Sequence, residues 1–335
     1  MKNILVDEEY KKLFNKIIID APNYFSFELV NFKFPDKKLN IQLRNADAII
    51  GQVNLSESQY KSAKNLRIIQ TLSAGYDRID LKEAKKQNVI IANNNGANAI
   101  SVAEHVLMLI LALYRNLIFH HNSIINGSWK NLKYKNMEIH GKNLGIFGLG
   151  NIGVALAKRA TALGLNVNYF DIERKFKEEK NIGLKYVFPE DLLKKSDIVS
   201  YHIPKTKYTY QIINQKTINQ MQKNAILINT SRGYIHNERD IYEALSNRKI
   251  FGAGLDVFEK EPLQKNSPLR KLKNVLLTPH SAPNKECYPR AIRNAILNLT
   301  RIFEGKAPMS CAKNYEEITQ KFLKDFPNIK FMDKN

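Results

Sequence analysis

The chain has 335 residues, and its 52 lysines and arginines against 32 aspartates and glutamates give a formal net charge of +20. This length predicts two domains, and a hydrophobic content of 44% is enough for a core in each. The charge is compatible with nucleic-acid binding, with an anionic substrate, or with a lysine-rich proteome. Because the basic residues are scattered and form no stripe interleaved with aromatic residues, we favour the last and expect no nucleic-acid partner.

The two cysteines, Cys287 and Cys311, show no metal-ligand spacing and cannot form a disulfide framework, which is typical of a reducing cytosol. The chain turns acidic at residues 7–9, before an apolar signal segment could form. Its longest apolar stretch, residues 106–113, is far shorter than the roughly 20 residues that span a bilayer. We therefore expect a cytoplasmic protein that binds neither a metal nor a membrane.

The first 95 residues alternate short apolar runs with helical patterns. The predicted strands are residues 17–19, 48–50, 66–70 and 89–92. One helix is expected to begin at Ser56, and another, capped by Asp80, to run through residue 86. Residues 4–6 fit either a strand or the approach to a helix. Strands separated by helices predict a parallel sheet.

Small residues follow the strand that ends near residue 70, in the order Ser73, Ala74 and Gly75. Ligands of open α/β sheets bind outside the carboxyl ends of the strands. The backbone N–H groups of Ala74 and Gly75 are therefore candidates for holding a carboxylate. A plain turn leading to the Asp80 cap explains these residues equally well.

Residues 101–116 form a predicted helix that is apolar at core spacing and therefore buried on several sides, between domains or at a subunit contact. Within it, Glu104 and His105 are interpreted as satisfied buried polar groups and not as catalysts. Residues 116–140, which include Trp129, are expected to form a looped excursion.

A strand, a glycine turn and a helix follow in direct succession from residue 143 to residue 163. The turn reads Gly148-Leu149-Gly150-Asn151-Ile152-Gly153. Gly148 permits the tight turn, Gly150 leaves room for a pyrophosphate, and Gly153 lets the helix pack closely on the strand. The helix N-terminus, at Asn151 and Ile152, presents free N–H groups to the anion. This order predicts a dinucleotide-binding site.

The second strand of this unit, residues 166–170, ends at Asp171. A carboxylate at this position can accept hydrogen bonds from both ribose hydroxyls of an adenosine. It would also repel a 2'-phosphate, which favours NAD over NADP. Arg174 and Lys175 lie just downstream and could hold that phosphate, so the preference stays open at this point.

The alternation continues to the end of this region, with strands predicted at residues 144–147, 167–170, 186–188, 198–201, 225–229, 252–257 and 275–277. Helices are predicted between them at residues 191–195, 217–221 and 238–247. Seven strands in this order indicate one doubly wound sheet. Residues 289–303 form a predicted long helix, and the residues after Gly305 are expected to be a polar tail.

Three of these strands are followed by candidate catalytic residues, Arg232, Glu261 and His280. Transfer of a hydride to a ketone builds negative charge on oxygen, and a histidine can donate the proton that neutralises it. A neighbouring carboxylate such as Glu261 would orient the ring and raise its pKa. Arg232 offers a planar fork for a substrate carboxylate. Singly, each also fits a plainer role, as an ion-pair partner, a solvated acid or a loop histidine.

Between about residue 48 and residue 297, the chain resembles the D-isomer-specific 2-hydroxyacid dehydrogenases. The motifs that carry the resemblance are Ser73-Ala74-Gly75-Tyr76-Asp77, Ser101-Val102-Ala103-Glu104-His105, the glycine turn, His202-Ile203-Pro204, Asn229-Thr230-Ser231-Arg232-Gly233, Leu255-Asp256-Val257-Phe258 with Glu261-Pro262, and Thr278-Pro279-His280. Their number and order make the resemblance highly specific.

The resemblance implies an NAD-dependent enzyme in which His280 is the acid/base, Glu261 is its partner, and Arg232 binds the carboxylate and carbonyl of a small anionic substrate. Ala74 and Gly75 would hold that carboxylate by their N–H groups. On the cofactor side, it implies that Asp256 bonds the nicotinamide carboxamide, that His202 and Pro204 line the adenosine pocket, and that Thr230 lies near the nicotinamide.

It also implies two Rossmann- or flavodoxin-like α/β domains, each a doubly wound parallel sheet, with an active-site cleft between them that closes on substrate. Residues 1–95 and 285–335 would form the substrate-binding domain, residues 96–284 the NAD-binding domain, and a homodimer would form through the latter.

The loop of residues 51–55 contains no arginine to bind a phosphate. This favours reduction of glyoxylate or hydroxypyruvate. D-3-phosphoglycerate dehydrogenase is the alternative, because residues 169–173 resemble that branch and the chain is basic. An NAD-sensing corepressor is a further alternative, and Glu261 argues against formate dehydrogenase.

Overall fold

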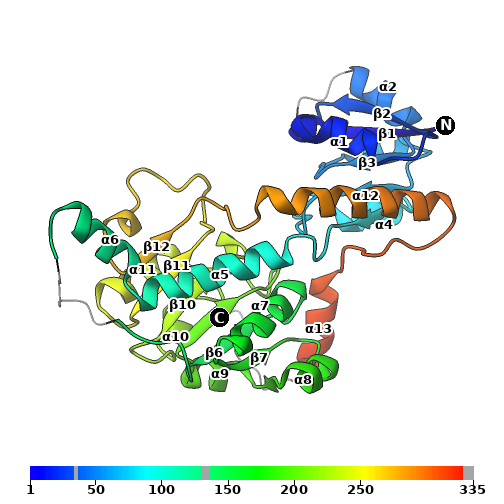
Figure 1. The fold of residues 1–335 in the computed structure, drawn as a ribbon. Coiled ribbons are helices and arrows are strands. Elements are labelled where there is room, and N and C mark those ends of the chain that lie inside the picture. Colours follow the sequence, from blue (N-terminus) through cyan, green and yellow to red (C-terminus); the bar gives the residue numbers. More distant parts are fainter. Residues whose placement is uncertain (34–36, 130–135, 327–335) are drawn as a thin grey trace. The chain divides into compact units, whose positions relative to one another are not determined.

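The computed structural model describes residues 1–33, 37–129 and 136–326, and these form two compact units. The smaller unit contains Met1–Asn98 and Asn284–Asn314, and the larger contains Ala99–Pro283 and the segment from Tyr315 onward (Figure 1). The smaller unit is thus built from two separate parts of the chain. Its division from the larger unit lies close to the boundaries expected at residues 95 and 285.

The smaller unit is a five-stranded parallel sheet in the order β2-β1-β3-β4-β5. Its strands are β1 Lys2–Asp7, β2 Phe25–Val30, β3 Ala48–Ile50, β4 Ile68–Gln70 and β5 Ile90–Ala92. One face is covered by α1 Phe14–Ile19 and α12 Tyr288–Phe303, and the other by α2 Lys37–Asn45, α3 Glu57–Ser62 and α4 Leu81–Lys86. This strand order is that of flavodoxin-like folds, as expected.

Local signals placed the helix starts of this unit correctly. The Ser56 side chain caps α3 by accepting a hydrogen bond from the Gln59 N–H, and Asp80 caps α4 by accepting from Lys82 and Glu83. Residues 4–6, which fitted two interpretations, lie in strand β1, between β2 and β3.

The strand predicted at residues 17–19 is wrong, because these residues end the helix α1. The isoleucine run suggested a strand, yet only Ile17 is buried there. Strands β1 and β2 are parallel neighbours, so the chain between them must cross over, and α1 makes that crossover. The strand at this edge is β2, which the sequence analysis missed.

The larger unit is a seven-stranded parallel sheet in the order β12-β11-β10-β9-β6-β7-β8. Its strands are β6 Asn143–Phe147, β7 Asn166–Phe170, β8 Lys185–Tyr186, β9 Ile198–Tyr201, β10 Ile226–Asn229, β11 Gly252–Leu255 and β12 Val275–Leu277. This is the doubly wound strand order of a Rossmann fold with one added strand. The strands remain parallel, and the direction in which successive strands are added to the sheet reverses between β6 and β9. The predicted fold class and strand number are therefore confirmed.

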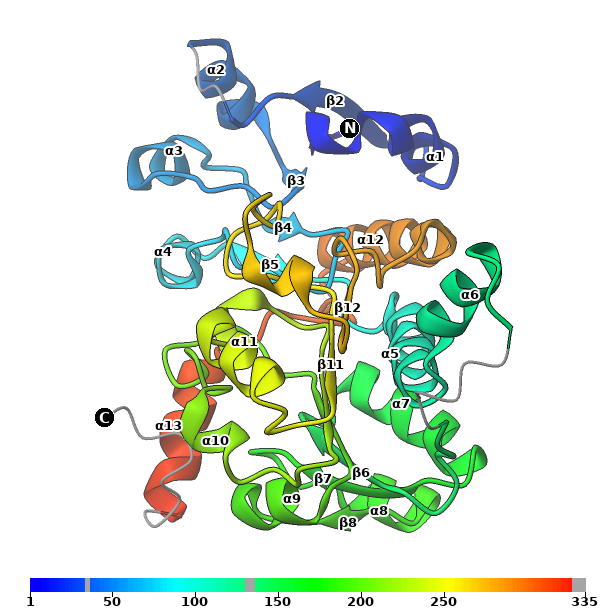
Figure 2. The ribbon, with the colours of Figure 1, turned by 90° about the vertical axis from the view of Figure 1, so that its left-hand side faces the viewer.

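Helices cover both faces of this sheet (Figure 2). On one face lie α5 Ala99–Tyr114 and α7 Asn151–Ala162, around a core that includes Leu109, Leu144 and Leu156. On the other lie α9 Pro189–Lys195, α10 Gln215–Ile218, α11 Glu238–Ser246 and α13 Tyr315–Asp325. The remaining helices are α6 Leu117–Ile125 and α8 Phe176–Ile182, with short 3-10 turns at Glu8–Leu13, Gly233–Ile235, Pro268–Lys271 and Lys285–Cys287.

The C-terminal segment differs from the expectation of a polar tail on the smaller domain. Its helix α13 packs on the larger unit, where the Phe322 ring lies 5.8 Å from that of Phe170. Phe322 is buried because its helix has one apolar face. Residues 327–335 lie outside the described part of the chain.

Two further expectations around α5 are wrong. Part of the predicted loop at residues 116–140 is the helix α6, which Asn116 separates from α5 by its left-handed φ of 48°. Glu104 is not buried, since its side chain is 60% exposed and pairs with Arg159 at 3.7 Å.

Within the described residues, no single helix is long and apolar enough to cross a bilayer. Only α5 and α6 together pass that test, and they are bent by 62° to each other.

Candidate active site

The glycine turn after β6 has the geometry that the sequence predicted. Gly148 adopts a φ of 91°, and a Cβ at this position would lie 2.6 Å from the carbonyl oxygen of His202. A Cβ on Gly153 would collide with the carbonyl of Gly148, whereas one on Gly150 would meet no described atom within 4 Å. Two glycines are therefore required by the fold itself. The third keeps an open space in front of the helix.

That open space lies at the start of α7, where Gly150 is the N-cap residue and supplies no side chain to the helix end. The first N–H groups of the helix, from Asn151 and Ile152 onward, have no partner within the helix and carry its positive end. The helix has 12 residues, so its dipole is well developed. This end of α7 can hold an anionic pyrophosphate.

Asp171 lies immediately after β7, beside the same turn. Its carboxylate accepts hydrogen bonds from the N–H groups of Leu149 at 2.7 Å and Glu173 at 2.9 Å. Burial raises the pKa of Asp171, although these two donors oppose the rise. The carboxylate thus fixes the glycine turn, and its binding of an adenosine ribose stays a prediction.

The two cations downstream of Asp171 are engaged with carboxylates. Arg174 donates two hydrogen bonds to Glu179, at 2.8 and 3.0 Å, and Lys175 lies 3.4 Å from Glu173. Neither cation is therefore unpaired and ready for a 2'-phosphate, and the surroundings of Asp171 fit NAD.

Two buried polar atoms at the carboxyl ends of β9 and β10 have no hydrogen-bond partner among the described residues. They are Nδ1 of His202 and Oγ1 of Thr230. The other nitrogen of His202 bonds the Ser200 hydroxyl at 2.9 Å, and burial lowers the pKa of His202 to about 4, so the ring is neutral near pH 7. Because buried polar groups are normally satisfied, these two atoms fit a site for a polar cofactor. Pro204 nearby is fixed by a 2.7 Å bond from Thr209 to its carbonyl.

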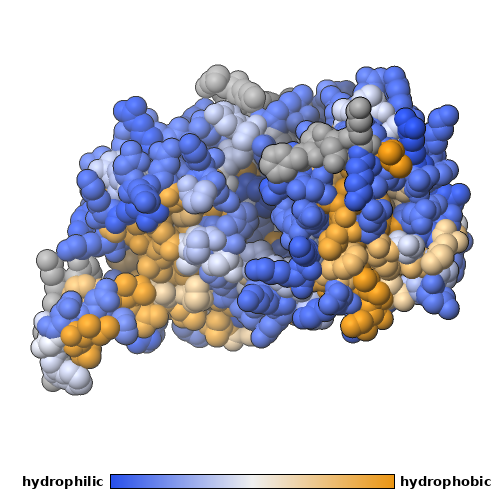
Figure 3. Space-filling view, turned by 90° about the horizontal axis from the view of Figure 1, so that it is seen from above, coloured by the Kyte–Doolittle hydropathy of each residue, from blue (hydrophilic) through white to orange (hydrophobic). Residues whose placement is uncertain are grey.

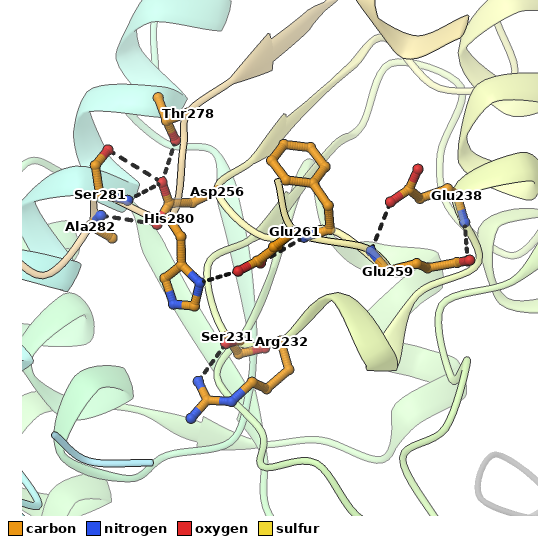
Figure 4. A network of polar contacts seen from close by, with 11 residues as sticks. Ser231, Arg232, Glu238, Asp256, Glu259, Glu261, Thr278, His280, Ser281 and Ala282 are labelled. Carbon is orange, nitrogen blue, oxygen red and sulfur yellow. Dashed lines mark hydrogen bonds and ion pairs between the residues drawn. The ribbon is translucent and has the colours of Figure 1, made fainter. Parts of the chain in front are cut away.

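The structure brings His280 and Glu261 together at the carboxyl edge of the same sheet. Nδ1 of His280 lies 2.7 Å from a carboxylate oxygen of Glu261, whose other oxygen accepts from the Phe258 N–H at 3.1 Å (Figure 4). A carboxylate can only accept, so Nδ1 carries a proton and Nε2 remains for a substrate. The two side chains are 41% and 37% exposed, which leaves the pair accessible.

Asp256 holds the loop that carries His280. Its buried carboxylate accepts hydrogen bonds from the Thr278 hydroxyl at 2.6 Å and from the N–H groups of Ser281 and Ala282 at 2.9 Å. His280 itself has a left-handed φ of 51° and donates its N–H to the Asp256 carbonyl at 2.8 Å. Residues other than glycine rarely adopt this conformation, and the four bonds stabilise it. A bond from Asp256 to the nicotinamide carboxamide stays a prediction, since the residue has no exposed surface here.

His105 was not predicted to belong to the site, yet it contacts this loop from α5. Its Nε2 lies 3.0 Å from the Thr278 hydroxyl and 3.6 Å from the Asp256 carboxylate. Burial lowers the pKa of His105, against the opposing effect of Asp256. The interpretation of His105 as a satisfied polar group is thus correct, and its partners are Thr278 and Asp256, which anchor the loop that carries His280. Its position within a motif of the resemblance was the signal for this.

Arg232 lies in a turn that is closely packed against the Glu261 loop. A Cβ on Gly233 would overlap the carbonyl group of Phe258, so only glycine permits this approach. The Arg232 guanidinium donates to the Ser231 carbonyl at 2.7 Å, and Figure 4 shows it below the His280–Glu261 pair. A cavity of about 510 Å³ adjoins the pair, with an apolar lining that includes Pro262 and Leu277. Glu261 and His280 line this cavity, and that Arg232 shares a site with them stays a prediction.

Ala74 and Gly75 belong to the smaller unit, in the loop after β4. Their carbonyls accept hydrogen bonds, from Asn93 at 2.8 Å to Ala74 and from the Ser73 hydroxyl at 3.0 Å to Gly75. Their N–H groups make no hydrogen bond to another described residue. The loop therefore has fixed carbonyls and open donors, and binding of a carboxylate there stays a prediction.

Comparisons with known proteins identify the family of the chain. The family model described as "D-isomer specific 2-hydroxyacid dehydrogenase, NAD binding domain" matches residues 107–282. A glyoxylate reductase of Korarchaeum cryptofilum is 36% identical over 82% of this chain and 85% of its own length. One of Thermococcus litoralis is 40% identical over 71% and 75% of the two chains. A D-3-phosphoglycerate dehydrogenase of Archaeoglobus fulgidus is 37% identical over 71% of this chain but 45% of its own.

Solved structures show the same fold. An acyclic imino acid reductase in complex with NADPH and D-Arg superposes with a TM-score of 0.80 at 28% identity, over 93% of this chain and 100% of that one. A protein of Pyrococcus horikoshii gives a TM-score of 0.81 at 27% identity, over the whole of both chains. The matched family model and the relatives therefore identify an NAD-dependent oxidoreductase. The chain belongs to the D-isomer specific 2-hydroxyacid dehydrogenase family.

The open space at Gly150 generates a test of the cofactor site. We expect Gly150→Ala to fold with the stability of the wild type, because the added methyl group meets no described atom, and to raise the Kd for NADH by roughly tenfold or more, because it occupies the space of the pyrophosphate. Fluorescence titration with NADH, together with thermal unfolding, measures both. Unchanged NADH affinity would contradict the predicted position of the pyrophosphate at Gly150.

Proposed function

We propose that this protein reduces a small 2-keto acid, glyoxylate or hydroxypyruvate, with NADH, and that His280 is its acid/base. The observation that carries the proposal is the 2.7 Å contact between His280 and Glu261, which leaves Nε2 of an accessible imidazole as the reactive nitrogen. Relatives named glyoxylate reductase, at 36–40% identity, support this substrate class.

The roles of the residues follow from the charge that develops during reduction. NADH supplies the hydride when it is bound. As the carbonyl carbon of the keto acid receives the hydride, its oxygen becomes an alkoxide, and His280 donates the proton from Nε2 that completes the alcohol. Glu261 stabilises the imidazolium that exists before this transfer. The Arg232 fork binds the substrate carboxylate and polarises the adjacent carbonyl. In the reverse direction, His280 accepts the hydroxyl proton.

The contacts to the cofactor are proposed residue by residue. The turn from Gly148 to Gly153 holds the pyrophosphate, and Asp171 binds the adenosine ribose. His202 and Pro204 line the adenosine side, with Thr230 toward the nicotinamide, which the two unpartnered atoms of His202 and Thr230 support. Asp256 completes the set through the carboxamide. In the smaller unit, the N–H groups of Ala74 and Gly75 bind the substrate carboxylate.

The loop of residues 51–55 supports a small, unphosphorylated substrate. It contains no basic residue, and its Gln52 donates to the Ser73 hydroxyl at 2.8 Å. A Cβ on Gly51 would lie 3.0 Å from the Asp7 Cβ, so this loop is packed against an acidic residue. An acid is unfavourable beside a phosphate. 3-Phosphohydroxypyruvate remains the second candidate, because two D-3-phosphoglycerate dehydrogenases are 36–37% identical to the chain.

A substrate panel tests the class, the cofactor and the substrate together. NADH oxidation is measured with glyoxylate, hydroxypyruvate, pyruvate and 3-phosphohydroxypyruvate, and with NADPH in parallel. We expect the highest kcat/KM with glyoxylate or hydroxypyruvate, and a preference of roughly tenfold or more for NADH, because Asp171 repels a 2'-phosphate. Highest activity with 3-phosphohydroxypyruvate would select the second candidate. Tight NADH binding without turnover of any keto acid would favour a cofactor-sensing protein such as a corepressor.

The acid/base role of His280 has its own test. We expect His280→Ala to lower kcat by roughly a thousandfold, within the range known for loss of a general acid, while the Kd for NADH changes by less than about twofold. The matched control is His140→Ala, which removes an exposed histidine of the same unit. Retained activity in His280→Ala would remove the residue from this role.

We further propose a homodimer formed through α5 and α6. Exposed apolar side chains lie on both helices, among them Met108 and Leu111 on α5 and Leu117, Ile118 and Ile125 on α6. Figure 3 shows hydrophobic residues at its left-hand end, where α6 lies. Patches of this kind mark interaction surfaces. Light scattering should give a molar mass of about twice the 38.6 kDa of one chain, and a monomer at micromolar concentration would contradict the proposal.

The free thiols of Cys287 and Cys311 also support a reducing, cytoplasmic location.

A further inference from the structure

His236 is a buried histidine that none of the steps above uses. It follows the 3-10 turn Gly233–Ile235, directly after the turn that carries Arg232, and it has no exposed surface. Its neighbours fix its backbone, since Ile213 donates to the Ile235 carbonyl at 2.9 Å and Asn237 donates to the Ile213 carbonyl at 2.9 Å. A buried imidazole at this place needs hydrogen-bond partners.

The partner of His236 is the side-chain amide of Asn229, the last residue of β10. The amide oxygen of Asn229 accepts from the N–H of Ser231 at 3.0 Å and from its hydroxyl at 2.9 Å. The amide nitrogen donates to the Arg232 carbonyl at 3.0 Å and contacts Nδ1 of His236 at 2.9 Å. Every donor and acceptor of this buried amide is therefore used, and three of its four bonds go to the turn that carries Arg232.

These partners determine the state of the ring. The Ser231 N–H can only donate and the Arg232 carbonyl can only accept, so the orientation of the Asn229 amide is unambiguous. Its nitrogen is then a donor, and Nδ1 of His236 must accept from it. The proton of the neutral ring lies on Nε2, which has no hydrogen-bond partner among the described residues and faces the Glu238 carboxylate at 4.0 Å.

Beyond Nε2 of His236, Glu238 contacts the loop that carries Glu261. Glu238 and Glu259 are joined reciprocally, because the N–H of each donates to the carboxylate of the other, at 2.8 and 2.7 Å (Figure 4). Burial opposes ionisation of Glu238, but the nearby His236 and the Glu259 N–H outweigh it and lower its pKa. Glu259 lies two residues before Glu261, so this clamp fixes the loop of the acid/base pair.

We propose that His236 is a positioning residue for the reaction: by fixing the amide of Asn229 it holds the turn that places Arg232 for the substrate, while its Nε2 faces Glu238, which itself clamps the Glu261 loop. It does not touch the substrate or the cofactor. A ring that donated from both nitrogens would lose the Asn229 bond, so the turn depends on an acceptor at this position. The inference rests on the proposed function only for its activity readout.

Three substitutions of His236 distinguish a positioning role from a role in core packing alone. Asparagine places an amide oxygen at the position of Nδ1, so His236→Asn keeps the acceptor for Asn229. His236→Gln places its polar group one atom further out, near Nε2, and lacks that acceptor. His236→Leu retains bulk but supplies neither. We expect kcat/KM for the keto acid to fall roughly tenfold in the leucine and glutamine variants, the order of one lost hydrogen bond, and to stay within about threefold in the asparagine variant.

Two further readouts distinguish positioning from instability. The Kd for NADH should change by less than about threefold in all three variants, because most of the proposed cofactor contacts, those of residues 148–153 and Asp171, lie outside the turn that contains Thr230. Amide hydrogen exchange in a peptide covering residues 229–236 should accelerate in the leucine and glutamine variants only, because the Ser231 N–H bonds the Asn229 amide. The matched control is Ser196→Ala, which removes a buried 2.6 Å bond to the Leu192 carbonyl at the amino-terminal end of β9.

The outcomes are separable. If His236→Leu loses no more activity than Ser196→Ala, or if asparagine rescues no better than glutamine, His236 is merely structural and the proposal fails. If the leucine variant does not fold, the comparison of the asparagine and glutamine variants decides. If the wild type turns over no keto acid, the proposed function fails, and the exchange pattern of the three variants still tests His236 by itself.

Discussion

The site depends on the buried carboxylate of Asp256. A carboxylate without exposed surface is costly unless its oxygens are hydrogen-bonded, and here the donors come from the loop that follows β12. The requirement to satisfy this charge therefore fixes the path of residues 278–282. Because His280 lies within this segment, its backbone is held in a left-handed conformation that a residue other than glycine rarely adopts. The proposed acid/base pair, His280 and Glu261, is thus positioned by another acidic residue, Asp256.

The glycine turn, the strand ends and the fold class could be predicted from the sequence because their causes are local. Gly148 and Gly153 meet steric requirements within one turn, whereas a Cβ on Gly150 would meet no described atom, so the role of Gly150 rests on the proposed cofactor. Parallel strands direct their carboxyl ends to one edge, so the loops that carry Arg232, Glu261 and His280 could be predicted to lie along that edge once seven strands were recognised. The contact of Glu261 with His280 follows from this topology.

The features that were missed depend on contacts between distant residues. The isoleucines at residues 17–19 favour a strand locally, and the need for a crossover between β1 and β2 overrides that preference. Helix α13 has a buried face only because Phe170 lies beneath it. His105 and His236 support the catalytic loops from positions that no spacing rule connects to them. Their partners become visible only when the side chains are placed.

The ion pairs beside Asp171 have a consequence for the evolution of this site. Arg174 and Lys175 are already at the end of β7, where an enzyme using a phosphorylated cofactor needs positive charge, and Glu179 and Glu173 neutralise them. A lineage changing its coenzyme from this starting point would not have to acquire a base. It would have to lose acids, and Tyr169, whose hydroxyl bonds Glu179 at 2.7 Å, would restrain that change. The choice of coenzyme therefore depends on the carboxylates of Glu173 and Glu179, which pair with Lys175 and Arg174.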